Sequence, residues 1–243
     1  MNDILFYAEA NKLNSTIGNY FFAFGAIVMI AYCIFNAKNY HLSIKKVIPF
    51  AIIAYVIIVL WNFILYWVES GFQKFGGNNL VRIFIWVPVF IYPMCKLAKL
   101  DFRTMCDYLA PMICVHHAAS HAGCMFRGCC YGYPWENGIY NHVLRYNTFP
   151  IQIIEAIVAA VIVLILWLRE KKNGFKVTGE EYPLMLILFG YSRFLLEFLR
   201  DNPKLFLGIS SLAIHALIMG LVGTAWYITV RERNRRKQRR KVH

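Results

Sequence analysis

The feature that most constrains the fold of this chain is a series of apolar segments, each close to the length that crosses a bilayer. Seven can be read in the sequence, at about 19–36, 47–68, 81–97, 107–126, 151–168, 183–199 and 206–230. A membrane-spanning helix needs roughly 20 mostly apolar residues, and helices satisfy their own backbone polar groups in lipid. The pattern therefore predicts an all-α integral membrane protein, a polytopic bundle of about seven transmembrane helices.

The composition agrees with a membrane protein. The chain is 59% hydrophobic and 16% charged, whereas a soluble domain carries about 25% charged residues. Its aromatic share of 16% suits a lipid-facing surface with Tyr and Trp at the interfaces. We see no internal repeat and no soluble domain. We therefore expect a single transmembrane domain over residues 1–243, with a basic tail at 231–243.

Lys and Arg are distributed unevenly over the connections between the apolar segments. One set of connections and the tail hold most of the 26. The other set holds six, namely Lys12, Lys74, Arg127, Arg145, Arg200 and Lys204. Because cytoplasmic loops carry the excess of positive charge, we expect the N-terminus outside the cell and the C-terminus in the cytoplasm. A basic tail directly after an apolar segment favours anionic lipids over nucleic acid, so we expect no nucleic-acid partner.

The densest group of ionisable and thiol side chains lies at the end of the fourth apolar segment. The 17 residues from His116 to Gly132 contain three His, three Cys, one Arg and three Gly. Ionisable side chains at membrane depth usually mark a functional site. On a helix, His117, His121 and Cys124 share one stripe, and His116 points about 100° away from it.

The spacing alone leaves several interpretations of this group open. It fits a hydrogen-bonded His pair in a helix interface, a polar headgroup site, a metal site formed by two His and a Cys, or thiol chemistry at Cys129 and Cys130. Gly123, Gly128 and Gly132 with Arg127 among them favour recognition of a phosphate. We expect at least one of the three outer cysteines to be a free thiol that lines the cavity. If Cys129 or Cys130 is paired, Cys124 is the nearer partner in sequence, because adjacent cysteines form a strained disulfide.

Two further polar patterns occur in apolar segments. Gln152 and Glu155 are neighbours on the first turns of the fifth segment, where a buried Glu155 needs a partner. Arg193, Glu197 and Arg200 form an i, i+4, i+7 stripe at the end of the sixth segment. This stripe fits either a structural ion-pair ladder or an Arg pair that holds a phosphate while the Glu orients one guanidinium group.

Taken together, these patterns resemble the prolipoprotein diacylglyceryl transferase family. Tyr20 resembles a Tyr at the start of that family's first span. The run from Ser120 to Gly132 resembles its signature Gly-Arg-x-Gly-Asn-x-x-Asn-Gly-Glu-x-x-Gly, with the glycine spacing retained. The fifth and sixth segments resemble its Pro-x-Gln-x-x-Glu and Arg-x-x-x-Glu-x-x-Arg motifs.

The chain departs from this signature at several positions. His121 stands where the family has Arg, Cys124 and Arg127 where it has Asn, and Cys129 where it has Glu. The His-Gly-Gly that the family carries before its third span corresponds to Phe75-Gly76-Gly77, which lacks the His.

The resemblance implies a seven-helix bacterial cell-membrane transferase with its active site near the outer face. Such an enzyme moves the diacylglyceryl group of phosphatidylglycerol onto the cysteine thiol of a lipobox-type peptide and releases glycerol phosphate. It implies neither a metal ion nor a cofactor. The catalytic residues that we expect are His117 as the base, His121 as a headgroup contact, and Arg193 with Glu197. The residues that we expect to contact substrate are Tyr20, Gly123, Cys124, Arg127, Gly128, Cys129, Gly132, Gln152, Glu155 and Arg200.

Two other hypotheses stay open on the sequence. One is a membrane metal- or thiol-redox protein that uses His117, His121 and the cysteines at 124, 129 and 130. The other is a lipid-binding relative of the transferases with a different acceptor.

Overall fold

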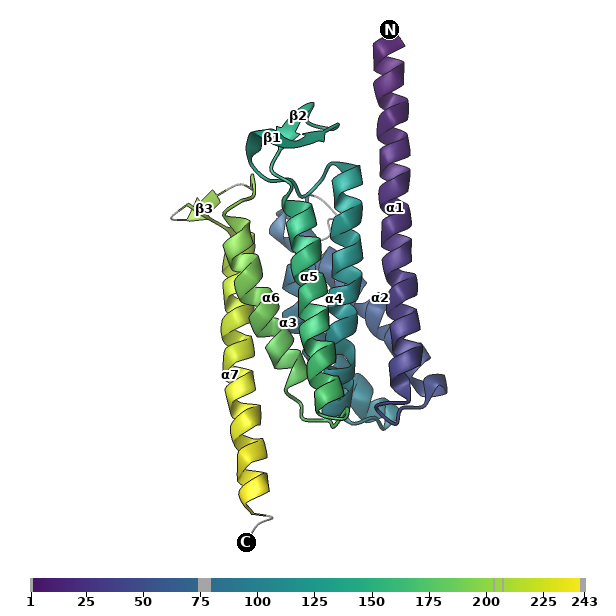
Figure 1. The fold of residues 1–243 in the computed structure, drawn as a ribbon, viewed down its shortest axis with the longest axis vertical. Helices are drawn as coiled ribbons and strands as arrows, with labels where there is room; N and C mark the ends of the chain where they lie inside the picture. The colour runs from purple at the N-terminus through teal and green to yellow at the C-terminus, as the bar shows by residue number, and fades with distance from the viewer. Residues whose placement is uncertain (1, 74–79, 203, 207, 241–243) are drawn as a thin grey trace.

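The computed structural model describes residues 2–73, 80–202, 204–206 and 208–240. Within these residues the chain forms seven helices and two small antiparallel sheets (Figure 1). The helices are α1 (Asn2–Ala37), α2 (Ile44–Glu69), α3 (Leu80–Ala98), α4 (Phe102–Arg127), α5 (Ile151–Lys172), α6 (Glu181–Glu197) and α7 (Ser211–Arg239). The strands are β1 (Pro134–Asn141) with β2 (Tyr146–Thr148), and β3 (Lys204–Phe206) with β4 (Ile209–Ser210).

The seven predicted segments correspond to the seven helices, with differences at their ends. The first helix begins at Asn2 rather than near residue 19, and no Pro or Gly interrupts the sequence before Gly18. The seventh begins at Ser211 rather than 206, because the preceding residues form β3 and β4. The connection between α4 and α5 contains the β1–β2 hairpin.

Four helical segments are long and apolar enough to cross a membrane: 12–37, 44–68, 151–172 and 211–239. The segment 83–98 of α3 is apolar but shorter. The fold thus fits an integral membrane helical protein. The helix α4 is less apolar because it carries buried Asp107, His116, His117 and His121.

The bundle is organised around α4, which packs along α1 and α5, while α6 packs along α7. The N-terminus and the β1–β2 hairpin lie at the upper end in Figure 1, and the C-terminus lies at the lower end. Helices in lipid associate through close packing and hydrogen bonds rather than through hydrophobic burial. Such packing is tight between α6 and α7, where a Cβ on Gly190 would come within 2.4 Å of the Gly220 nitrogen.

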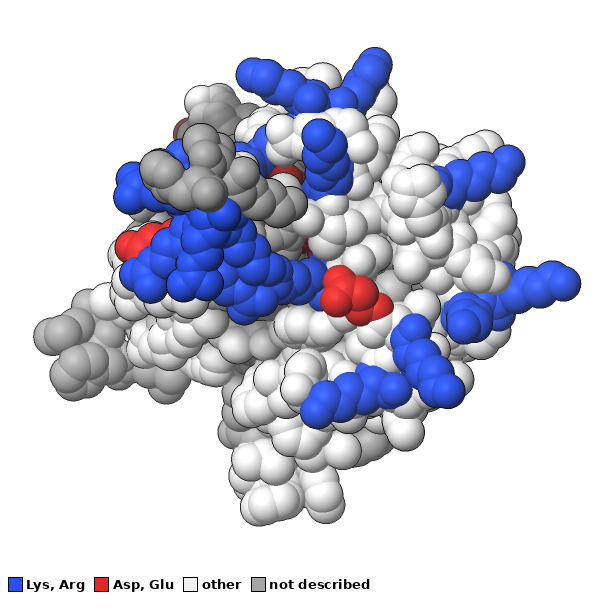
Figure 2. All heavy atoms as spheres, turned by 90° about the horizontal axis from the view of Figure 1, so that it is seen from below, with Lys and Arg blue, Asp and Glu red and all other residues white. Residues whose placement is uncertain are grey.

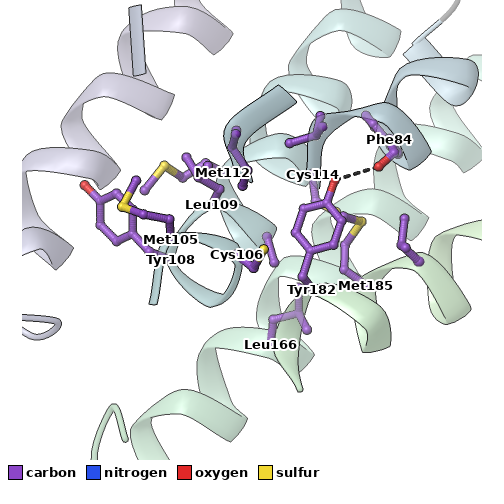
Figure 3. Packing of buried hydrophobic residues seen from close by; sticks show 14 of the residues in the cluster. Phe84, Met105, Cys106, Tyr108, Leu109, Met112, Cys114, Leu166, Tyr182 and Met185 are labelled. Carbon is purple, nitrogen blue, oxygen red and sulfur yellow. Dashed lines mark hydrogen bonds between the residues drawn. The ribbon is translucent and has the colours of Figure 1, made fainter. Parts of the chain in front are cut away.

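Hydrogen bonds from buried tyrosines fasten neighbouring helices within the apolar core (Figure 3). The hydroxyl of Tyr182 on α6 donates to the carbonyl oxygen of Phe84 on α3 at 2.7 Å. The hydroxyl of Tyr108 on α4 donates to the carbonyl oxygen of Cys33 on α1 at 2.6 Å. These bonds fix the lower part of α4 against α1 and the start of α6 against α3.

A group of polar residues at the lower end, the lower polar cluster, consists of the buried Tyr40, Asp107, Glu170 and Glu181 and the half-buried Arg169. The Asp107 carboxylate accepts hydrogen bonds from the backbone nitrogens of Thr178, Gly179 and Glu181 at 2.7–3.0 Å, and so caps the start of α6. Glu170 accepts a hydrogen bond from the Tyr40 hydroxyl at 2.5 Å, and Arg169 pairs with Glu181 at 3.0 Å.

Lys and Arg side chains dominate the charged surface at the lower end of the bundle (Figure 2). The connections α1–α2, α3–α4 and α5–α6 and the basic tail all lie at this end. The uneven distribution of Lys and Arg along the sequence is therefore also an uneven distribution between the two ends of the bundle.

Candidate active site

Six ionisable side chains that the sequence singled out meet near the upper ends of α4, α5 and α6. This group, the upper polar cluster, consists of His117, His121, Glu155, Arg193, Glu197 and Arg200. All six are buried. Charged groups are buried at this depth only when they are paired, so the pairing within the cluster decides what it can do.

Glu155 is the centre of the upper polar cluster. One of its oxygens lies 2.7 Å from Arg193 Nη1, and the other lies 2.7 Å from His121 Nδ1. Arg200 forms a two-point contact with the same carboxylate through Nε and Nη2. A single carboxylate on α5 thus holds an imidazole from α4 and two guanidinium groups from the end of α6, which brings three separate sequence motifs to one point.

Glu197 forms the second acidic position of the cluster. Its carboxylate lies 2.6 Å from Arg193 Nη1 and accepts a hydrogen bond from the Ser210 hydroxyl at 2.8 Å. Asn202 donates to the same oxygen as Ser210. Ser210 also caps α7, because its hydroxyl oxygen accepts from the Ala213 backbone nitrogen. Two guanidinium groups therefore meet two carboxylates, and the fixed charges of the cluster nearly balance.

Several buried nitrogens in this cluster lack hydrogen-bond partners among the described residues. They are both ring nitrogens of His117 and Nε of Arg193. The His117 ring is only 1% exposed and packs between Phe189 and His121, at centroid distances of 4.6 and 4.3 Å. Because unpaired buried polar groups are costly, these nitrogens leave the cluster with hydrogen-bonding capacity that is available to a polar ligand.

The expected helical stripe is confirmed in its geometry. His117 and His121 face the upper polar cluster, whereas the His116 ring packs against Phe22 and Tyr55 on the other side of α4. His116 there lines an apolar cavity of about 110 Å³ between α1, α2, α3 and α4.

Close backbone packing explains Gly123 and Gly132 of the signature, and a left-handed backbone conformation explains Gly128. A Cβ on Gly123 would lie 2.7 Å from the carbonyl oxygen of Gly18 on α1. Gly128 ends α4 with a left-handed φ of 67°. A Cβ on Gly132 would lie 2.7 Å and 2.8 Å from the carbonyl oxygens of Phe149 and Leu199. Gly132 thereby lets the segment after α4 pair with the end of α6 at Arg200. Direct contact of these glycines with substrate stays a prediction.

The thiols of Cys124, Cys129 and Cys130, the three-cysteine cluster, lie within 4.8 Å of one another and are half-buried. All three are free thiols in the structure. Hydrogen bonds from the Cys124 and Cys129 thiols, together with the nearby Arg200, hold the pKa of the Cys130 thiol well below its ordinary value. Gln152 fixes the neighbouring backbone by donating to the Cys129 carbonyl oxygen at 2.9 Å.

Two expected substrate contacts lie apart from this arrangement. The Tyr20 side chain is 69% exposed on α1. Arg127 turns toward α1, where it donates to Asn19 Oδ1 at 2.6 Å and lies over the Phe22 ring. The Phe75-Gly76-Gly77 segment lies outside the described residues. Sequence reasoning missed Ser210 and Asn202 as partners of Glu197, although a Ser before the last apolar helix is a recognisable capping signal.

Comparisons with known proteins find one family and several relatives with similar sequences. A family model described as prolipoprotein diacylglyceryl transferase matches residues 20–229. A phosphatidylglycerol–prolipoprotein diacylglyceryl transferase of Clostridium tetani is 28% identical over 47% of the chain, and the match spans 48% of that protein. A second such transferase, of Clostridium perfringens, is 24% identical over 75% of the chain and 73% of its own length. The transferase of Methylobacillus flagellatus is 28% identical over 84% of the chain and 70% of its length.

Proposed function

Because the chain belongs to the prolipoprotein diacylglyceryl transferase family, we propose that it moves the diacylglyceryl group of phosphatidylglycerol to a lipoprotein cysteine thiol. The observation that carries this proposal is the upper polar cluster. There Glu155 holds Arg193, Arg200 and His121 together beside nitrogens that lack partners among the described residues. The names of the relatives support both substrates, a phospholipid and a prolipoprotein.

The proposed reaction is a substitution at the glyceryl carbon that carries the phosphate ester. The acceptor thiol loses its proton, its sulfur forms a bond to that carbon, and the carbon–oxygen bond to the phosphate breaks. Glycerol phosphate leaves with the electron pair of the broken bond, and the product is a thioether. The protein must therefore supply a base for the thiol and positive charge for the departing phosphate.

Arg193 and Arg200 are suited to stabilise the departing phosphate. Arg193 lies near the upper end of α6, and Arg200 lies three residues after the helix ends. Glu155 and Glu197 hold their guanidinium groups in place. Arg193 Nε has no partner among the described residues, so it retains a donor for a phosphate oxygen. Guanidinium groups bind phosphate through paired, directed donors, and a lysine ammonium does not reproduce this geometry.

The contacts favour His121 rather than His117 as the base. The sequence-based hypothesis gave this role to His117, but Glu155 contacts His121 Nδ1 at 2.7 Å. A carboxylate on one ring nitrogen orients the imidazole and stabilises its protonated form after it accepts a proton at the other nitrogen. His117 contacts the His121 ring and is the more deeply buried of the two. We therefore propose that His117 supports the His121 ring and makes a polar contact to bound substrate.

The proposed membrane arrangement is a single transmembrane domain over residues 1–243 with seven spans, the N-terminus outside and the C-terminus inside. It is supported by the position of the basic connections and tail at the lower end of the bundle, because cytoplasmic loops are enriched in Lys and Arg. The upper polar cluster then lies near the outer face of a bacterial cell membrane. Reporter fusions after residue 240 test it, and a reporter that is active only outside the cell would contradict the orientation.

The decisive experiment places the purified full chain in phosphatidylglycerol vesicles with a peptide that carries a lipobox-type cysteine. We expect the peptide to gain a diacylglyceryl group by mass spectrometry while glycerol phosphate is released. Phosphatidylethanolamine vesicles and a Cys→Ser peptide are the controls. If glycerol phosphate is released and the peptide stays unmodified, the acceptor is different. If lipid binds without turnover, the chain is a lipid-binding relative and the transferase proposal is wrong.

A further inference from the structure

We propose that the thiols of Cys124, Cys129 and Cys130 form a binding site for a thiophilic metal ion of the Zn²⁺ class. This site lies beside Arg200 of the upper polar cluster, and the observations that support it do not depend on the proposed transfer activity. It replaces the Asn and Glu of the family signature with soft sulfur ligands at Cys124 and Cys129.

The first support is the convergence of three thiols from a short stretch of chain. Their sulfur atoms all lie within 4.8 Å of one another, and the three side chains are half-buried, so that an ion can reach them. Thiolates are the preferred ligands of Zn²⁺ in proteins, and three of them leave one coordination position open.

The backbone after α4 is shaped to bring these thiols together. Gly128 adopts a left-handed φ of 67°, and the Cys129 nitrogen then donates to the Cys124 carbonyl oxygen at 3.2 Å. This closed turn folds the chain back across the last turn of α4. Cys130 itself has a φ of 59°, a conformation that a side chain other than Gly rarely adopts. Such backbone positions concentrate at functional sites, where surrounding contacts maintain them.

The local charge favours a metal–thiolate group at this place. A Zn²⁺ ion with three thiolates carries one net negative charge, and the positively charged Arg200 guanidinium lies near the Cys130 thiol. His117, His121 and Glu155 also lie close enough together to share an ion. That second group is the poorer site, because Arg193 and Arg200 already occupy the Glu155 carboxylate and would repel a cation.

Two alternative roles for the three cysteines are a covalent lipid carrier and a disulfide. A cysteine that accepted the lipid would hold it as a thioether, which does not pass the lipid on, so these residues are unsuited to a covalent carrier role. A disulfide between Cys129 and Cys130 is strained because they are adjacent. A disulfide from Cys124 to either one would leave a single thiol and is an outcome that the test must distinguish.

The test uses the full chain, purified in detergent, reduced and stripped of metal, and then titrated with Co²⁺ alone. We expect about one Co²⁺ per chain, with a thiolate-to-cobalt charge-transfer band and the visible spectrum of a tetrahedral sulfur-rich site. Zn²⁺ should displace the Co²⁺ and raise the melting temperature. Cys124→Ser, Cys129→Ser and Cys130→Ser should each weaken Co²⁺ binding at least about tenfold.

Cys95→Ser is the matched control, because Cys95 is buried in α3 outside the cluster. It should keep the full charge-transfer band. If a Cys variant fails to fold, alkylation of the native chain gives a second measurement, since Zn²⁺ should protect all three thiols together. The proposal is wrong if the reduced wild-type chain binds no Co²⁺ through sulfur, if His117→Ala alone abolishes the band, or if the native thiols resist alkylation because two of them form a disulfide.

Discussion

Two clusters of buried charged side chains lie at opposite ends of the helix bundle, and they differ in how completely their polar atoms are paired. In the lower polar cluster both Asp107 oxygens accept backbone hydrogen bonds, and Glu170 accepts from tyrosine hydroxyls. Among the described residues of this cluster, one buried side-chain atom, Glu181 Oε2, lacks a partner. In the upper polar cluster His117 and Arg193 keep three such nitrogens.

This difference in hydrogen-bond pairing is a way to distinguish charged residues that hold helices together from charged residues that bind a ligand. Both clusters bury their carboxylates, and both combine Arg with carboxylates, although Arg169 of the lower cluster is more exposed than Arg193 and Arg200. Burial of carboxylates and the combination of charges therefore do not distinguish the clusters. A cluster whose polar atoms are paired within the protein holds helices together, whereas one with unpaired polar atoms is incomplete without a ligand. The comparison therefore supports the proposal that lipid turnover takes place at the upper cluster, and it favours a helix-positioning role for the lower one.

The largest expected effect is at Arg193. We expect Arg193→Ala to reduce phosphatidylglycerol turnover by about 10³-fold, because the developing phosphate charge loses a directed donor. Arg193→Lys should recover little of this loss. The measurement is release of labelled glycerol phosphate, normalised to the folded protein in the membrane. Arg169→Lys, in the lower cluster, is the control and should retain turnover. Full activity of Arg193→Lys would make the upper cluster a structural ion pair, like the lower one.

The next effect separates the two histidines. We expect His121→Ala to lower turnover by about 10²-fold through loss of the base. His117→Ala should cost less, because His117 lies behind His121. The pH dependence is informative, since loss of the base should remove the acidic limb of the rate profile in His121→Ala but leave it in His117→Ala. If His117→Ala instead lost the acidic limb and His121→Ala kept it, His117 would be the base, as the sequence-based hypothesis proposed.

The sequence predicted the number and approximate positions of the helices, because hydrophobic segments of membrane length are a local property of the chain. It also selected the residues that meet in the upper polar cluster. It did not identify Glu155 as their common partner, because the rotation of α5 relative to α4 and α6 is a tertiary property. Arg127 illustrates the same limit, since spacing placed it with the phosphate site while packing turned it to Asn19 on α1.

A smaller effect tests whether the turn after α4 positions the upper cluster. We expect Gly132→Ala to reduce turnover about tenfold, because the new Cβ would lie less than 3 Å from two backbone carbonyl oxygens and displace the chain beside Arg200. Gly174→Ala is the control at the lower end, where nothing lies within 4 Å and only a left-handed φ of 62° must be maintained. It should cost about 1–2 kcal/mol of stability and leave turnover intact. Equal turnover in both variants would contradict a positioning role for Gly132.

The smallest expected effect on turnover, and the clearest effect on stability, is at Asp107. Its carboxylate accepts three backbone hydrogen bonds at the start of α6, and Asn offers one acceptor oxygen and an amide donor that faces those donors. Hydrogen bonds to a charged group contribute about 1.5–3 kcal/mol each, so Asp107→Asn should lower the free energy of unfolding by about 2–3 kcal/mol. Asp101→Asn is the matched control, because Asp101 caps α4 from an exposed position and should cost about 1 kcal/mol or less. Thermal melting in detergent measures both.

Turnover per folded molecule should change less than about twofold in Asp107→Asn, because this paired cluster lies at the far end of the bundle from Glu155. A loss of turnover without a loss of stability would mean that the lower cluster is functional too, and that nearly complete pairing is not a sufficient sign of a structural role.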